Sequence, residues 1–160
     1  MLSVHIICVG KMKEKFYIGA AEEYAKRLSA YCKLTVTELS EEKLPQNPSQ
    51  ALIDAALAKE GQAIRAKLPP AARLVALCVE GKPHSSEQLA ELVSACELSS
   101  VKHLVFLIGG SFGLDPTLKQ EAAVRLSMSP MTFPHHLARV MLLEQVYRAF
   151  KINEGSAYHK

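Results

Sequence analysis

The chain has 160 residues, a formal net charge of +3 at pH 7, 49% hydrophobic residues and 22% charged residues. A chain of this length and ordinary globular composition is expected to form one domain, residues 1–160, with a buried core. The mild positive charge permits contact with a polyanion without requiring it. We expect no membrane partner and no secretion, since no apolar run approaches the length of a membrane span and the N-terminus lacks a signal-peptide pattern.

The four cysteines are scattered without a C-x-x-C pair, at positions 8, 32, 78 and 96. Cys8 and Cys78 lie in apolar, strand-like runs, where a thiol packs as a small hydrophobic group. We therefore expect neither a disulfide nor a metal site, and a reduced, cytoplasmic location.

The N-terminal half begins with a predicted buried strand at 3–9, which Gly10 ends. Lys11, Lys13 and Lys15 follow at once. These lysines could bind phosphate oxygens or remain solvated loop charges, and the sequence favours neither. A helix over about 14–30, a half-exposed strand at 34–39, a proline-containing loop at 41–49 and an alanine-rich helix at 50–67 are expected next.

The C-terminal half repeats this alternation. A buried strand at 73–80 is expected to end in a turn at 81–83, and a helix to about residue 97 follows with Ser85 and Gln88 as a capping box. The most apolar strand is predicted at 103–108, followed by a short helix at 117–122 and a last strand at 124–128. Strands and helices of these lengths in alternation indicate an α/β fold, with a mainly parallel sheet flanked by helices.

A glycine-rich loop, Gly109-Gly110-Ser111-Phe112-Gly113, follows the strand predicted at 103–108. Open α/β sheets bind ligands beyond the carboxyl ends of their strands, and glycine lets the backbone approach a ligand closely. The spacing is neither that of a dinucleotide fingerprint nor that of a P-loop. The loop therefore predicts either a cleft for a small ligand held by backbone groups or a tight strand-to-helix turn.

The end of the chain contains its most unusual residues. Pro130 and Pro134 make 129–134 a stiff loop, and Thr132 is expected to cap a helix over about 135–151. Apolar residues surround this helix almost completely, at positions 137, 140, 141, 142, 143, 146, 147 and 150. Such a helix is expected to be buried on several sides, and in so short a chain a second subunit would provide one covering surface.

The string MTFPHHLARVMLLEQVYRAFKINEGSAYHK resembles the C-terminal signature of the ribosomal large-subunit methyltransferase H family, in the SPOUT class of knotted methyltransferases. The resemblance covers the whole chain in length and in order of elements. It implies a SPOUT α/β fold with a C-terminal trefoil knot, S-adenosyl-L-methionine as cofactor, and a homodimer. The implied reaction is methyl transfer to N3 of a pseudouridine in 23S ribosomal RNA, with the assembled ribosome as substrate and no metal.

The resemblance also implies which residues bind the cofactor. They are the end of one strand, the glycine loop and the turn before the last helix: Leu77, Gly109, Met128, Ser129, Pro130, Met131, Thr132 and Phe133. Cys78 departs from the family pattern, because many relatives carry an acid there, and this puts a side-chain role at position 78 in doubt.

The reaction requires in-line alignment and removal of one proton from a weakly acidic imide. The catalytic candidates are Glu144, Tyr158 and His159. Glu144 could act as a base or form an ion pair with Arg148 at i+4. His135 and His136 are further base candidates that could instead cap the helix or pack at a subunit contact.

The remaining candidates concern RNA. Arg139 and Arg148 could bind phosphates or hold the dimer together. In the tail, Tyr158 offers a stacking face, His159 a proton acceptor and Lys160 a charge for phosphate. Composition alone favours a frayed tail, whereas the resemblance implies a functional one.

Two other functions account for parts of the sequence. A nucleotide- or flavin-binding α/β domain would need a phosphate cradle, which neither glycine loop provides. A non-catalytic ribosome-associated factor would use the lysines and the tail, and would bind RNA without binding the cofactor.

Overall fold

Strands and helices alternate from the first residues to the C-terminal helix in the computed structural model, which describes residues 1–159. The described residues form five strands and five helices: β1 (Ser3–Val9), α1 (Lys15–Leu28), β2 (Lys33–Leu39), α2 (Gln50–Arg65), β3 (Arg73–Pro83), α3 (Ser86–Leu98), β4 (His103–Ile108), α4 (Pro116–Glu121), β5 (Val124–Ser127) and α5 (His135–Asn153).

The five strands form one sheet in the order β2-β1-β4-β3-β5, and every neighbouring pair is parallel. The sequence-based prediction of a mainly parallel sheet flanked by helices is confirmed. Because all strands point the same way, their carboxyl ends meet at one edge of the sheet. The loops that follow β1, β3, β4 and β5 therefore gather at that edge.

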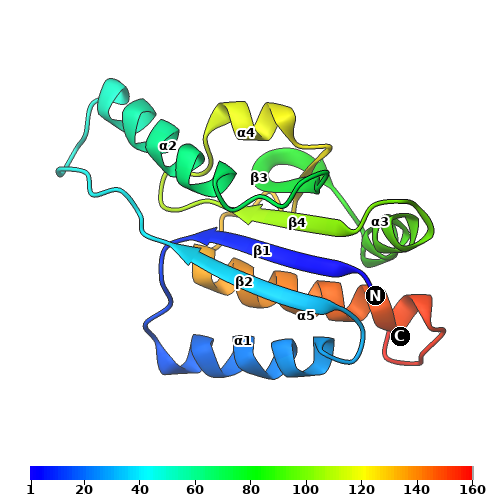
Figure 1. The fold of residues 1–160 in the computed structure, drawn as a ribbon. Helices are drawn as coiled ribbons and strands as arrows, with labels where there is room; N and C mark the ends of the chain where they lie inside the picture. The colour runs from blue at the N-terminus through cyan, green and yellow to red at the C-terminus, as the bar shows by residue number, and fades with distance from the viewer. Residues whose placement is uncertain (160) are drawn as a thin grey trace.

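Helices cover both faces of the sheet. Figure 1 shows α1 and α5 on one side and α2 and α4 on the other, with α3 beside the far end of α5. Successive residues of β1 face opposite layers: Ile6 packs in the cluster with α3 and α5, and Ile7 in the cluster with α2 and α4. Strands buried on both faces read as continuous apolar runs, as in the β4 sequence HLVFLI.

Local signals predicted the helix ends unevenly. The capping box at α3 is present, with both Ser85–Gln88 hydrogen bonds formed. At α5, however, Pro134 occupies the N-cap position and the described residues supply no side-chain cap, so the expected capping by Thr132 is wrong. Pro134 is extended, with φ −53° and ψ 137°, and Thr132 therefore lies too far upstream to reach the first turn.

Strand β3 is longer than expected and runs through Gly81-Lys82-Pro83 instead of turning there. The reason is β5, which supplies partners for Lys82 and Pro83 after an irregularity in register. No helix within the described residues is long and apolar enough to cross a membrane.

Candidate active site

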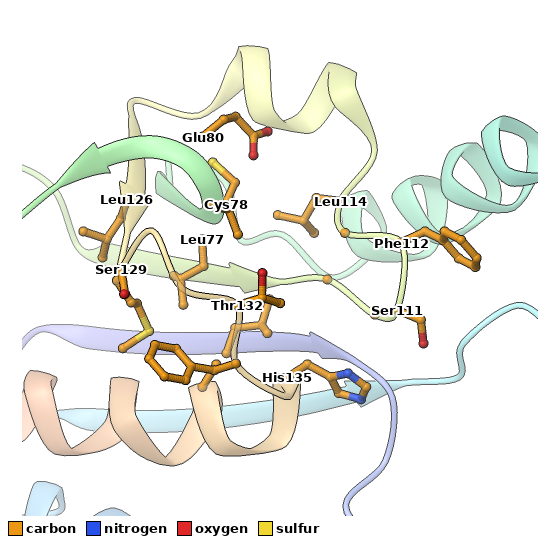
Figure 2. A pocket seen from close by; sticks show the side chains of 18 of the residues that line it. Leu77, Cys78, Glu80, Ser111, Phe112, Leu114, Leu126, Ser129, Thr132 and His135 are labelled. Carbon is orange, nitrogen blue, oxygen red and sulfur yellow. The ribbon is translucent and has the colours of Figure 1, made fainter. Parts of the chain in front are cut away.

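A cavity of about 300 Å³ lies at the carboxyl edge of the sheet, among the loops that follow β3, β4 and β5 (Figure 2). This volume is at the lower end of the range for small-molecule sites. Seven of the eight expected cofactor residues line it: Leu77, Gly109, Met128, Ser129, Met131, Thr132 and Phe133. The eighth, Pro130, lies in the same loop but is not part of the cavity wall. The topology thus brings three separate predicted segments together.

One wall of the cavity is an irregular stretch of β3. Leu77 and Lys82 both align with Leu126 of β5, so residues 78–81 bulge out between them without a recorded partner in β5. Their backbone N–H and C=O groups are thus left out of that ladder, although buried backbone groups normally find partners. Free backbone groups beside apolar side chains can bind the polar edge of a flat heterocycle. The sequence gave no sign of this bulge beyond Gly81.

Gly81 makes the bulge possible. A Cβ at this position would lie 2.8 Å from the backbone of Arg125 in the neighbouring strand. Cys78, in the same stretch, also lines the cavity and is only partly buried. It therefore differs from Cys8, which packs in the core as expected and whose thiol pKa is raised by burial to about 12.

The glycine loop after β4 is a tight turn and also lines the cavity. Gly113 donates its N–H to the Gly110 carbonyl at 3.1 Å, and has φ +84°. A Cβ at Gly109 would overlap the carbonyl group of Gly113. Gly109 is thus required by the loop itself, which corrects the expectation that its main purpose is a close approach to a ligand.

The glycine loop is also held from outside. The Ser111 N–H donates to the Glu41 carboxylate at 2.6 Å, across from the loop that follows β2. A carboxylate already occupies this N–H group, so the loop does not offer it to a phosphate. This arrangement argues against the nucleotide-binding alternative.

The turn before α5 orders itself through two serines. Ser127 donates its hydroxyl to the Ser129 carbonyl at 3.2 Å, and the Met131 N–H donates to the Ser129 hydroxyl at 3.0 Å. Figure 2 shows Thr132 directed toward the middle of the cavity, opposite Leu77. The Met131 side chain is 73% exposed at the rim.

The sequence analysis missed part of the cavity wall. The additional lining residues include Glu80, Phe112, Leu114, Lys119, Leu126 and Ala138. Lys119 donates to Glu80 at 2.6 Å, and this hydrogen bond lowers the pKa of the Glu80 carboxyl. Lys119 follows from no local motif, since α4 brings it over β3 only in the folded chain.

The catalytic candidates form a second cluster, at the other end of α5. Arg148 donates to Glu144 at 2.6 Å, so the ion pair expected at i+4 is present. The Tyr158 hydroxyl donates to the same carboxylate at 3.2 Å, and the Arg148 guanidinium lies 4.8 Å from the centre of the Tyr158 ring. Burial, followed by the nearby Glu144 charge, raises the pKa of Tyr158.

His159 completes this tail cluster, defined as Glu144, Arg148, Tyr158 and His159. One imidazole nitrogen lies 3.2 Å from Arg148, and the other 2.8 Å from Glu87 on α3. Residues 158–159 therefore pack on their own α3 and α5. Lys160, the third RNA-binding candidate, lies outside the described residues.

The tail cluster and the cavity share no residue within a single chain. His135 lines the cavity, whereas Glu144 lies nine residues further along α5, which corresponds to about 13 Å of helical rise. The structure thus gathers Glu144, Tyr158 and His159 together, but it does not bring them to the cavity of their own chain.

Arg139 is placed differently from expectation. Its side chain is buried, and it donates to Glu38 at 2.6 Å and to the Gly10 carbonyl at 3.0 Å. Both contacts point into the protein, so direct contact with RNA is not supported for Arg139. Although burial opposes ionisation of Glu38, hydrogen bonds from Arg139 and the Met12 N–H lower its pKa.

The two histidines at the start of α5 have different surroundings. His135 lines the cavity, and its pKa is lowered by burial and by the adjacent His136, so its imidazole is neutral at pH 7. His136 lies 3.6 Å from the Glu14 carboxylate on its Nδ1 side. Its Nε2 atom is buried and has no hydrogen-bond partner among residues 1–159.

The part of the chain that the structure describes contains no group of three or more His, Cys, Asp or Glu side chains placed to hold a metal ion.

Comparison with known proteins identifies the family. The family model described as "Predicted SPOUT methyltransferase" matches residues 2–159. A protein named ribosomal RNA large subunit methyltransferase H from Bifidobacterium adolescentis is 47% identical over 159 residues, covering 99% of this chain and 100% of the relative. Proteins of the same name from Clostridium novyi and Pelotomaculum thermopropionicum are 48% and 46% identical, with 99% of this chain covered and 100% and 99% of each relative. The chain therefore belongs to the ribosomal RNA large subunit methyltransferase H family of the SPOUT class.

Proposed function

We propose that this chain is an S-adenosyl-L-methionine-dependent methyltransferase that modifies N3 of a pseudouridine in 23S ribosomal RNA. Its substrate is the assembled ribosome in the cytoplasm. The observation that carries the proposal is the cavity at the carboxyl edge of the sheet, where the bulge at 78–81 leaves backbone groups free among apolar side chains. The relatives' names supply the class of substrate.

The residues of the cavity fit the cofactor. Leu77, Leu114 and Leu126 provide an apolar sheath for the adenine ring, and the backbone of 78–81 provides donors and acceptors for its polar edge. The serine-ordered turn 128–133 and Gly109 close the remaining sides. When bound, the cofactor supplies a methyl group already activated on a sulfonium. We also infer the trefoil knot of the SPOUT fold for the segment that contains this turn.

The protein must align the target nitrogen and manage one proton. His135 is neutral and lines the cavity, so it is available to accept a proton at that end of α5. Glu144 is already bonded to Arg148 and Tyr158, which suits a positioning role for the carboxylate and leaves the Tyr158 ring and His159 to contact the RNA.

We infer that the working form is a homodimer in which the tail of one chain serves the cavity of its partner. The partly buried apolar residues Leu137, Val140 and Met141 leave one side of α5 available for a second copy. The separation of the tail cluster from its own cavity supports the same inference. Arg148 and Lys160 are proposed to contact RNA from this tail.

Calorimetric titration with S-adenosyl-L-methionine, followed by transfer of labelled methyl groups to ribosomes that lack the modification, tests the proposal. We expect cofactor binding and labelling of 23S RNA at a pseudouridine. Ribosome binding without cofactor binding would instead establish the non-catalytic ribosome-associated factor.

A further inference from the structure

A second cavity, of about 380 Å³, lies between the N-termini of α1 and α5. Its walls come from the loop after β1, the loop after β2 and the first two residues of α5. We call it the lysine cavity, lined by Gly10, Lys11, Lys13, Glu14, Ser40, Glu41, His135 and His136. His135 also lines the cofactor cavity, so the two cavities are neighbours on either side of one imidazole.

The electrostatics of the lysine cavity favour an anion. Lys11 and Lys13 are solvent-exposed, and no ion pair is recorded for either within residues 1–159. The described residues also provide no side-chain cap for α1 or α5. Two uncapped helix N-termini therefore add unpaired N–H groups and positive dipole ends to the lysine charges.

Two carboxylates share this cavity, and both have partners in the chain. Glu41 accepts a hydrogen bond from the Ser111 N–H at 2.6 Å, and Glu14 lies 3.6 Å from His136. Hydrogen bonding to backbone N–H groups lowers the pKa of Glu14, so it remains ionised. The two lysines, by contrast, have no recorded partner among the described residues and remain available to a ligand.

The loop that carries the lysines is held in place from below. Arg139 donates to the Gly10 carbonyl at 3.0 Å and to Glu38 at 2.6 Å, and Glu38 accepts the Met12 N–H at 2.8 Å. Gly10 has φ +106°, a conformation that few other residues adopt. Lys11 and Lys13 flank the anchored Met12, so the backbone that bears them is positioned before any ligand arrives.

We propose that the lysine cavity binds a backbone phosphate of the substrate RNA next to the target nucleoside. This inference rests on the proposed function. A phosphate seated here would place the adjoining base at His135, where the lysine cavity meets the cofactor cavity. The chemistry that recognises the ligand is that of a phosphodiester: lysine ammonium groups and helix N-terminal N–H groups.

The test compares three variants on ribosomes that lack the modification. Lys11→Ala/Lys13→Ala removes both cavity charges. Lys15→Ala/Lys33→Ala removes two exposed lysines that do not line the cavity, one of them only two residues beyond Lys13. Lys33→Ala/Lys102→Ala removes two exposed charges next to the amino ends of β2 and β4, at the opposite edge of the sheet.

The readout is ribosome affinity as a function of monovalent salt. Each lost phosphate contact to a single strand should reduce the log–log salt slope by about 0.7, so the cavity variant loses about 1.4. That slope corresponds to binding about 25-fold weaker at 0.1 M salt and nearly unchanged on extrapolation to 1 M. Both control variants should keep a slope within about 0.5 of the wild type. Cofactor affinity, measured by calorimetry, should stay unchanged in all three.

Each other outcome counts against the inference. Equal losses in the cavity variant and in the Lys15→Ala/Lys33→Ala control would indicate diffuse charge attraction rather than a phosphate seat. Weaker cofactor binding in Lys11→Ala/Lys13→Ala would assign the cavity to the cofactor's carboxylate. An unchanged salt slope in that variant, with normal wild-type binding, overturns the phosphate site alone. A wild type that does not bind ribosomes at all overturns the proposed function as well.

Discussion

The cofactor cavity and the tail cluster are built from different materials. The cavity walls are mainly backbone and apolar side chains, held by the sheet and by short loops with their own hydrogen bonds. The tail cluster consists of charged and aromatic side chains, joined by Arg148 to Glu144 and His159. A site of the first kind tolerates changes of pH and salt, whereas one of the second kind depends on each partner. Binding and transfer should therefore be separable by mutation.

The largest effect is expected from removing the tail. Deletion of residues 157–160 should abolish methyl transfer to ribosomes and leave cofactor binding intact, because these residues do not line the cavity of their own chain. Calorimetry and methyl transfer measured on the same preparation check both halves.

Complementation shows which cavity the tail serves. Thr132→Trp should fill the cavity without disturbing the core, since Thr132 is exposed and points into the cavity. Mixing tail-deleted and Thr132→Trp chains in equal amounts gives about half heterodimers, each with one complete composite site, so about 25% of wild-type sites should return. Tag-purified heterodimers that bind cofactor yet remain inactive would show that the tail acts within its own chain.

The next largest effect should come from the glycine loop. Gly109→Val should abolish cofactor binding and also reduce stability by roughly 2 kcal/mol, because its Cβ overlaps the Gly113 carbonyl group. Gly113→Ala is the matched control: its Cβ meets nothing within 4 Å among the described residues, and only the φ of +84° opposes it, at about 1 kcal/mol. Urea unfolding and calorimetry measure both. A stable Gly109→Val protein would mean that the loop can rearrange.

A smaller loss is expected when the lysine loop loses its anchor. Arg139→Met keeps much of the buried volume but leaves Glu38 and the Gly10 carbonyl without their donor. The expected cost is about 2 kcal/mol, below the value for a fully buried pair because Glu38 is 34% exposed. Urea unfolding gives the stability, and ribosome affinity should fall with it. Normal stability would show that the ion pair contributes nothing net.

The smallest effect concerns pH. The pKa of His135 is lowered below its ordinary 6.5, so the unfolded chain binds this proton more readily than the folded one. The stability that its neutral form contributes is thus fully present above pH 6.5 and is lost as the pH falls below that value. His135→Gln should flatten this decline. His5→Gln is the control, since burial and His103 also lower the pKa of His5, far from the cavity. Identical pH profiles for wild type and His135→Gln would contradict the assignment.

The sequence by itself determined the elements and most of the cavity. Periodicity and turn residues located all five strands, and seven of the eight expected cofactor residues line one cavity. These predictions succeeded because strand burial and loop stiffness depend on neighbours a few residues away. Parallel strands then bring such loops to one edge whatever their separation in the chain.

Only the tertiary structure decided the contacts between distant segments. Arg139 is 101 residues from Glu38 and 129 from Gly10, so no local pattern distinguishes it from an RNA-binding arginine. The same holds for the bulge at 78–81, which β5 imposes on β3, and for Gly109, whose constraint comes from the backbone of Gly113. A side chain's chemistry is written in the sequence, but whether that chemistry faces solvent, a ligand or a buried partner is set by what the fold places against it.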